Sequence, residues 1–145
     1  MPIAKASILG YVAFQIEMIF HIVSQREWHA ALRAGSYQPE SLATEGFIHC
    51  SGREQVVETA NLFYKGRGDL VLLCIDEKKL AAPLKFEPPA SGPARTSDDF
   101  PHIHGALNLD AVVDVLEFAC AGDGFFCAST RAWPLVASLK RRVTD

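Results

Sequence analysis

Short runs of apolar and β-branched residues alternate along this chain with stretches in which apolar residues recur at helical spacing. Runs of the first kind predict β-strands. They occupy residues 18–23, 46–50, 69–75, 85–87, 102–104, 112–118 and 125–128. Helical spacing lies at residues 28–32, 56–64 and 132–142. Because the two clearest helices come early and strands dominate from the middle onward, the pattern predicts an α+β fold.

A serine and a glutamate three residues apart precede each of the first two predicted helices. Ser24 and Glu27 come before the first helical stretch, and Ser51 and Glu54 come before the second. In such a capping box the serine side chain accepts a hydrogen bond from the backbone N–H of the third helical residue. Both serines are therefore predicted to cap helix N-termini, and Gly35 is predicted to end the first helix.

The composition is that of a single globular domain. The chain has 145 residues, of which 49% are hydrophobic and 21% are charged, and its net charge is −3. This balance gives no general attraction to nucleic acid. The apolar run at residues 7–14 is too short to span a bilayer, so we expect no membrane association. Residues 1–17 are interpreted as an N-terminal extension and residues 18–145 as one domain.

The four cysteines do not form a C-x-x-C pair, and Cys50, Cys74 and Cys120 lie inside apolar runs. Buried cysteines of this kind usually behave as small hydrophobic residues. We therefore expect reduced thiols rather than disulfides. Reduced thiols favour a reducing compartment, and the sequence accordingly predicts a cytoplasmic protein.

Four of the five histidines lie in or beside predicted strands. Strand alternation places His49 on the same face as Ser51, and His102 on the same face as His104. His21 and His49 each precede a predicted helix N-terminus, which offers free N–H groups and partial positive charge to an anion. We therefore expect His21, His49 and His102 to line one cleft beside a phosphate site.

Each of these residues also has a simpler interpretation. A single histidine such as His21 is more often a core residue whose hydrogen bonds are satisfied, and Ser51 would be a helix cap only. Glu87 would ordinarily be a solvated strand end. The spacing of His102 and His104 is also typical of metal ligands, although no carboxylate or thiolate pattern accompanies it to support zinc. The sequence leaves these alternatives open.

Three segments of the chain resemble a known family. Residues 19–22, 45–51 and 100–105 read Ile-Phe-His-Ile, Glu-Gly-Phe-Ile-His-Cys-Ser and Phe-Pro-His-Ile-His-Gly. They are similar to the bacterial family catalogued as domain of unknown function 952. The resemblance covers roughly residues 18–118. The chain departs from the family pattern at His104, where a tyrosine is expected.

That family resembles, more remotely, the ADP-ribosyltransferase fold, which implies a split sheet with helices packed on it. In that fold an apolar-apolar-histidine signature on the first strand holds the nicotinamide-side ribose of NAD, and His21 matches its position. A position that is often a catalytic glutamate should fall near residues 100–104. His102 and His104 stand there instead, so the resemblance implies an incomplete set of transferase residues.

Three functional hypotheses follow. The first is an enzyme with ADP-ribosyltransferase-like or phosphotransferase-like chemistry, acting on an NAD-like or phosphorylated nucleotide, with His49 and His102 transferring protons. Its predicted ligand-binding residues are His21, Ser51, His104 and Glu87. The second is a non-catalytic module that binds nucleotides or anions, and the third is a histidine metal-binding protein. The expected partner is a small molecule or nucleotide, with an RNA end less favoured, and residues 88–99 are predicted to form a mobile lid.

Overall fold

The longest strands form an antiparallel sheet in the order β1-β4-β8. The computed structural model describes residues 18–89 and 99–126. In it, β1 is Met18–Ser24, β4 is Leu70–Asp76 and β8 is Val112–Glu117. All residues of the central strand β4 are buried except the last. A strand covered on both faces reads as a continuous apolar run, which explains the pattern of this segment.

Helices cover the two faces of this sheet. The buried residues of α2 (Gln25–Ala34) share a hydrophobic cluster with Leu73 of β4. Those of α4 (Val56–Phe63) share a second cluster with the neighbouring residue Leu72. Successive side chains of a strand point to opposite faces, so β4 contributes alternately to the two clusters. The core of the domain therefore lies on both sides of β4.

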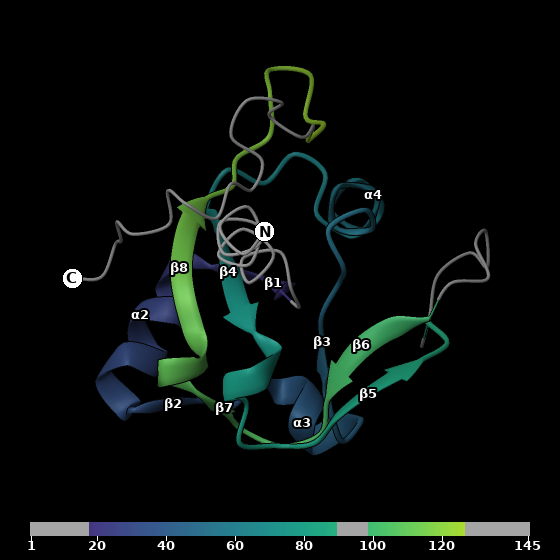
Figure 1. Cartoon of the computed structure of the whole chain (residues 1–145). Coiled ribbons are helices and arrows are strands. Elements are labelled where there is room, and N and C mark those ends of the chain that lie inside the picture. Colours follow the sequence, from purple (N-terminus) through teal and green to yellow (C-terminus); the bar gives the residue numbers. More distant parts are fainter. Residues whose placement is uncertain (1–17, 90–98, 127–145) are drawn as a thin grey trace, which may run out of the picture.

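A second antiparallel sheet has the order β3-β6-β5. Its strands are β3 (Ile48–His49), β5 (Leu84–Glu87) and β6 (Phe100–Ile103). A backbone bridge between Phe20 of β1 and Ser51, just beyond β3, joins this sheet to the edge of the first. Figure 1 shows β5 and β6 projecting away from the β1-β4-β8 sheet. The strands thus form two groups that meet where β1 lies beside the end of β3.

The first predicted capping box is confirmed. The backbone N–H of Glu27 donates to Ser24 Oγ at 3.1 Å, which fixes the start of α2. The helix ends at Gly35, whose φ of 87° lies in the left-handed region that favours glycine. Trp28 and Ala31 are the buried residues of the helix, and they pack toward the core as their spacing predicts.

The second predicted capping box is wrong. The backbone of Ser51 exchanges two 2.8 Å hydrogen bonds with Phe20, so Ser51 continues the strand instead of beginning a helix. Helix α4 starts only at Val56 and has no side-chain cap. The side chain of Gln55 accepts from the N–H of Gly52 at 2.7 Å and organises the intervening turn. Ser51 therefore pairs with β1, and the turn at residues 52–55 separates it from the start of α4.

Several short elements complete the described part of the chain. Strand β2 (Ser36–Tyr37) pairs with β7 (Leu107–Asn108), and helix α3 (Glu40–Thr44) follows β2. Two 3₁₀ turns, η1 (Glu77–Lys79) and η2 (Leu109–Ala111), lie beside each other. None of these elements has a hydrophobic run long enough to be recognised in the sequence.

Most predicted strands are confirmed within the described residues. They are those at 18–23, 69–75, 85–87, 102–104 and 112–118. The strand predicted at residues 46–50 shrinks to β3, because only its centre pairs with β6. A turn at residues 121–124 is closed by a 2.9 Å hydrogen bond from the N–H of Gly124 to the carbonyl of Ala121. Phe125 and Phe126, which were predicted to begin a strand, are not in one.

Residues 1–17, 90–98 and 127–145 lie outside the described residues. The predicted N-terminal extension, most of the predicted lid and the predicted closing helix fall there. Within residues 18–89 and 99–126 the fold is α+β with antiparallel sheets, as the sequence predicts. No helix in this part of the chain is long and apolar enough to cross a membrane.

Candidate functional site

A cleft of about 440 Å³ is lined by residues of β1, α4 and the segments near the starts of α2 and α3. His21, His49 and His102 all line it, together with Ser51. The structure therefore brings these four residues to one cavity, although they come from three distant parts of the sequence. Glu87 and His104 are not among the described residues that line the cleft. Their link to it runs through His102.

His21 is buried, and both of its ring nitrogens have internal partners. Nδ1 lies 2.6 Å from the carbonyl oxygen of His49, and Nε2 lies 2.7 Å from the hydroxyl of Tyr37. Burial lowers the pKa of His21 to about 4, so the ring is neutral near pH 7. A neutral ring whose Nδ1 faces a carbonyl carries its hydrogen there and accepts at Nε2.

This arrangement bears on the role that the family resemblance implied for His21. Binding a ribose hydroxyl requires a ring nitrogen that is not already occupied, and in this structure both nitrogens of His21 are bonded within the protein. The geometry agrees with the simpler alternative of a core histidine with satisfied hydrogen bonds. Tyr37, which sequence reasoning did not single out, presents its side chain to the cleft beside His21.

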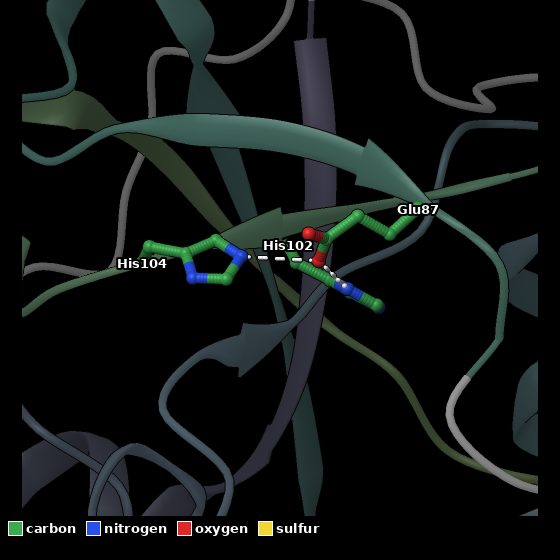
Figure 2. Close-up of side chains that lie close together, drawn as sticks. All are labelled: Glu87, His102 and His104. Atoms are coloured by element: carbon green, nitrogen blue, oxygen red, sulfur yellow. Dashed lines mark hydrogen bonds and ion pairs between the residues drawn. The ribbon is translucent and has the colours of Figure 1, made fainter.

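Glu87, His102 and His104 form a compact cluster on the second sheet. His102 Nδ1 lies 2.7 Å and His104 Nε2 lies 3.0 Å from the same carboxylate oxygen, Glu87 Oε1. Figure 2 shows both rings directed at this carboxylate. Lys85 pairs with His102 across β5 and β6, so Glu87, two residues further, projects from the same face and reaches the ring diagonally. The expected common face of His102 and His104 is confirmed by these contacts.

The cluster shifts the charge states of its members. Hydrogen bonds from His102 and His104 hold the pKa of Glu87 below its ordinary value, so the carboxylate is ionised at neutral pH. Burial lowers the pKa of His102, and its hydrogen bond to Glu87 only partly offsets that effect. The arrangement at neutral pH is therefore a carboxylate that accepts from an uncharged His102 ring.

Phe47 holds the ring of His102 in place. Their ring centroids are 4.0 Å apart with an interplanar angle of 16°, which is a stacked contact. His49 approaches the same ring edge-on at 5.6 Å, and its Nε2 lies 3.1 Å from Glu45 Oε1. His102 itself is only 2% exposed. Packing and the Glu87 hydrogen bond together fix the orientation of this ring, which a precise chemical role requires.

Glu87, His102 and His104 could also hold a metal ion. One ligand atom from each residue lies within 4.8 Å of the other two. Two imidazoles and one carboxylate are a common donor set for zinc and for non-haem iron. Sequence reasoning considered the two histidines as ligands but found no carboxylate for them. The signal it lacked was the register of β5 against β6, which brings Glu87 to their side.

The electrostatics of the cleft differ from the prediction of a phosphate site. Four glutamates line the cleft, and among the described lining residues Arg67 is the only lysine or arginine. Arg67 is bonded through two nitrogens to Asp69, each at 2.8 Å. Arg26 and Arg53, which follow the two serines of the predicted capping boxes, do not line the cleft. The second predicted helix N-terminus is displaced, because α4 starts at Val56, beyond the turn at residues 52–55, and not directly after Ser51.

These features define a small mixed α/β domain with antiparallel sheets and few helices. The chain belongs to the family described as "Protein of unknown function (DUF952)", whose model matches residues 22–115. The family resemblance deduced from the three sequence segments is thereby confirmed. The matched region contains every residue of the Glu87, His102 and His104 cluster.

Among solved structures, the chain is similar to the protein CC0527 from Caulobacter crescentus. The X-ray structure of that protein is 32% identical, with a TM-score of 0.67, and the match covers 76% of this chain and 93% of that chain. Its solution NMR structure is also 32% identical, with a TM-score of 0.62 and coverage of 74% and 90%. A comparison with curated proteins gives no match. The remote relation to the ADP-ribosyltransferase fold stays a hypothesis.

Proposed function

We propose that the protein is an enzyme that acts on a small molecule in this cleft, with His102 as the group that takes up and returns a proton. The observation that carries the proposal is the 2.7 Å hydrogen bond from His102 Nδ1 to Glu87 Oε1, made by a buried ring that lines the cleft. A histidine held at one nitrogen by a carboxylate is the usual arrangement of a general base.

Glu87 supports proton transfer by fixing the ring of His102. A carboxylate only accepts hydrogen bonds, so Nδ1 carries the hydrogen and the neutral ring has its lone pair on Nε2. Within residues 18–89 and 99–126 no hydrogen-bond donor reaches that Nε2. Glu87 would also stabilise the imidazolium formed when Nε2 takes a proton. His104 donates to the same carboxylate oxygen and favours its ionised form.

His49 is the second residue that we propose for proton transfer. It lines the cleft, its ring lies beside that of His102, and 42% of its side chain is exposed. Its Nε2 is bonded to Glu45, which leaves Nδ1 as the nitrogen that can accept. We assign Ser51 a ligand-facing role only, because its hydroxyl lines the cleft and does not cap a helix.

The ligand that fits this cleft differs from a simple phosphate compound. We propose a nucleoside-like or other small molecule that is uncharged or cationic in the part that enters the cleft. An NAD-like nucleotide would meet four glutamates and one arginine that is already paired, which disfavours its pyrophosphate there. ADP-ribosyl or phosphoryl transfer is therefore the less favoured form of the enzyme hypothesis, and an RNA end is disfavoured for the same reason.

The test is a panel of nucleosides, nucleotides, NAD fragments and small amines. Binding is measured as a rise in the melting temperature, because any ligand of the native state must raise it. Compounds that bind are then incubated at millimolar concentration, and products are identified by mass spectrometry. We expect His102→Gln and Glu87→Gln to keep binding and to lower turnover by about 10²- to 10⁴-fold. His29→Gln, an exposed histidine of α2, is the matched control.

Three outcomes would contradict the proposal in different ways. Binding without any turnover would favour the non-catalytic binding module instead of an enzyme. If no compound of the panel binds to a folded sample, the cleft is not a site for these ligands and the proposal falls. Equal loss of turnover in His29→Gln would show that the effect of His102→Gln is not specific to the cleft.

A metal site at Glu87, His102 and His104 is the second candidate function. The convergence of three ligand atoms within 4.8 Å specifically favours it. An ion bound through His102 Nδ1 and Glu87 Oε1 would replace the hydrogen between these two atoms, so a metal held in this way excludes their direct hydrogen bond. The third hypothesis from sequence thus gains a carboxylate ligand that the sequence pattern alone did not supply.

Calorimetric titration of chelator-treated protein with Zn²⁺, Co²⁺ and Ni²⁺ separates the two candidates. A metal protein should bind one ion per chain, and Glu87→Gln or His104→Ala should each weaken binding at least about tenfold. His29→Ala should leave it unchanged. If none of the three ions binds at micromolar concentration, the metal candidate is eliminated and the hydrogen-bonded arrangement stands.

A further inference from the structure

Most side-chain donors around the cleft form hydrogen bonds within the protein, so their hydrogens point away from the cavity. The clearest case is the chain formed by His49, His21 and Tyr37. His21 Nδ1 faces the His49 carbonyl at 2.6 Å and must donate to it. Burial lowers the pKa of His21 to about 4, so Nε2 is an acceptor. Tyr37 must then donate its hydrogen to Nε2 at 2.7 Å, and its oxygen offers the cleft only lone pairs.

The other two histidines of the cleft have the same polarity. His102 donates from Nδ1 to Glu87, and His49 donates from Nε2 to Glu45. In the neutral ring the remaining nitrogen of each is an acceptor. His102 is only 2% exposed, and no described residue donates to its Nε2. Because His102 lines the cleft, this nitrogen can accept a hydrogen bond from water or from a ligand.

Other side chains of the cleft also donate their hydrogen bonds to groups of the protein. The hydroxyl of Ser41 donates to the carbonyl of Phe47 at 2.7 Å, and the amide of Gln55 donates to the carbonyl of Asp99 at 2.9 Å. The side-chain N–H and O–H donors left among the described lining residues are three hydroxyls, part of one guanidinium and the second N–H of the Gln55 amide. The others belong to Ser24, Thr59, Tyr64 and Arg67. Acceptors therefore dominate the walls.

The charged side chains of the cleft are mostly negative, so they favour a ligand that donates hydrogen bonds, as the acceptors do. Glutamates from α2, α3 and α4 and from the turn before α4 line it, and they are Glu27, Glu40, Glu54 and Glu58. The single described arginine of the lining is bonded to Asp69 through two nitrogens. A cavity with one predominant sign of charge concentrates ligands of the opposite sign. This cavity attracts cations.

Apolar and aromatic side chains make up the rest of the walls. Phe20, Tyr37 and Tyr64 line the cleft, and so does Phe63, which is 53% exposed. Leu62, which is 46% exposed, lies beside Phe63 on the same lining. Aromatic faces attract cations as well as apolar groups. The walls therefore suit a ligand that combines an apolar or aromatic body with a positive charge.

We infer that the cleft selects an organic cation, namely a protonated amine or guanidinium on an apolar or aromatic body, whose N–H groups donate to Tyr37, His102 and the glutamates. The inference deepens the proposed function, because it rests on the cleft being the ligand site and adds the class of ligand. It does not depend on catalysis. It assigns Tyr37 and the rim glutamates as specificity-determining residues.

Three aromatic compounds of matched size test the inference directly. Tyramine is a cation, 4-ethylphenol is neutral and 4-hydroxyphenylacetate is an anion, while all three share the same ring. We expect saturable NMR shifts at cleft residues of the full chain, with tyramine binding at least about tenfold more tightly than the acid and 4-ethylphenol between them. The difference should shrink as salt rises, because screening weakens exposed charges.

The double variant Glu27→Gln/Glu54→Gln tests the charge without touching the buried groups. It should weaken tyramine about three- to tenfold and leave 4-ethylphenol unchanged. Glu117→Gln at the end of β8 is the control for each single substitution, Glu27→Gln and Glu54→Gln, since it removes one carboxylate outside the cleft. Tyr37→Phe removes the donor to His21, so its effect on binding is read only beside its melting temperature.

The outcomes separate this inference from the proposed enzyme. Equal or tighter binding of the acid overturns the inference, and so does the absence of saturable shifts at the cleft for all three compounds. If tyramine is preferred but no compound of the wider panel is turned over, the inference stands and the enzyme falls. If an anionic nucleotide is bound and turned over at the cleft, the enzyme stands and the inference falls.

Discussion

The two three-stranded sheets of this domain treat a buried histidine in different ways. In the β1-β4-β8 sheet, His21 lies opposite Leu73 and bonds a carbonyl and a tyrosine, so neither ring nitrogen remains for a ligand. In the β3-β6-β5 sheet, His102 bonds Glu87 through one nitrogen only. Both rings are buried, at 8% and 2% exposed, and both line the cleft. Burial alone therefore does not distinguish a structural histidine from a chemical one.

The difference follows from the surroundings of each sheet. The first sheet is covered on both faces by hydrophobic clusters, and a polar ring there must be satisfied internally. The second sheet has short strands, and it carries its polar groups on one face beside the cleft. The buried histidine that keeps a ring nitrogen without a described partner thus belongs to the second sheet. Four experiments test this contrast, from the largest expected effect to the smallest.

The largest effect should come from a cavity in the first sheet. Leu73 in the centre of β4 is 0% exposed, so Leu73→Ala should lower the free energy of unfolding by about 2–5 kcal/mol. Phe86 on β5 is 54% exposed, and Phe86→Ala should cost less than about 1 kcal/mol. Urea unfolding followed by circular dichroism measures both. Equal losses would show that the second sheet is sealed as tightly as the first.

Acid should destabilise the protein through His21. Its folded pKa of about 4 lies below the unfolded value near 6.5, so between these values the unfolded state binds more protons. The contribution of His21 to the free energy of unfolding is fully present above pH 6.5 and decreases as the pH falls toward 4. The loss between pH 7 and pH 5 should be about 2 kcal/mol.

The variant His21→Gln should remove this part of the pH dependence, whereas His29→Gln in α2 should retain it. Both are measured as unfolding free energies across the pH range, and the lowered pKa of His102 adds a smaller contribution of the same sign. A variant His21→Gln that keeps the full acid dependence would assign the effect to another group. Direct NMR titration of the His21 ring gives an independent reading.

The two Ser-x-x-Glu segments should respond differently to the same substitution. Ser24→Ala removes the cap of α2 and should cost about 1 kcal/mol. Ser51→Ala removes only a 3.5 Å contact with Thr59 and should cost less than about 0.5 kcal/mol. Urea unfolding, with hydrogen exchange at the starts of both helices, provides the measurement. A matching loss in Ser51→Ala, with faster exchange at the start of α4, would restore the capping interpretation.

The smallest effect concerns the carboxylate of the second sheet. Hydrogen bonds from His102 and then from His104 lower the pKa of Glu87. His104→Ala should therefore raise that pKa part of the way toward its ordinary value, and His102→Ala should raise it further. Carbon-13 NMR titration of the Glu87 carboxylate follows both changes, with His29→Ala as control. No change in either variant would mean that the cluster does not form in solution.

The sequence by itself determined the strands with long apolar runs, the first helix and the family. Residues 69–75 read as a buried strand because both faces of β4 are covered, and Ser24 caps α2 although it also ends β1 and pairs with Leu70. These features depend on residues that are near each other in the chain. Local pattern is sufficient for them, because periodicity and capping act over a few residues.

Only the tertiary structure decided the site. Ser51 has the same capping pattern as Ser24, yet its backbone pairs with Phe20 of a strand some thirty residues away. From the sequence, Glu87 would ordinarily be a solvated strand end, but the register of β5 and β6 places its carboxylate beside His102 and His104. His21 matched a ligand-binding position in sequence, and its partners come from Tyr37 and His49. Each of these outcomes depends on contacts between residues that are far apart in the sequence. Because a buried polar atom needs a hydrogen-bond partner, the tertiary arrangement decides which partner it has.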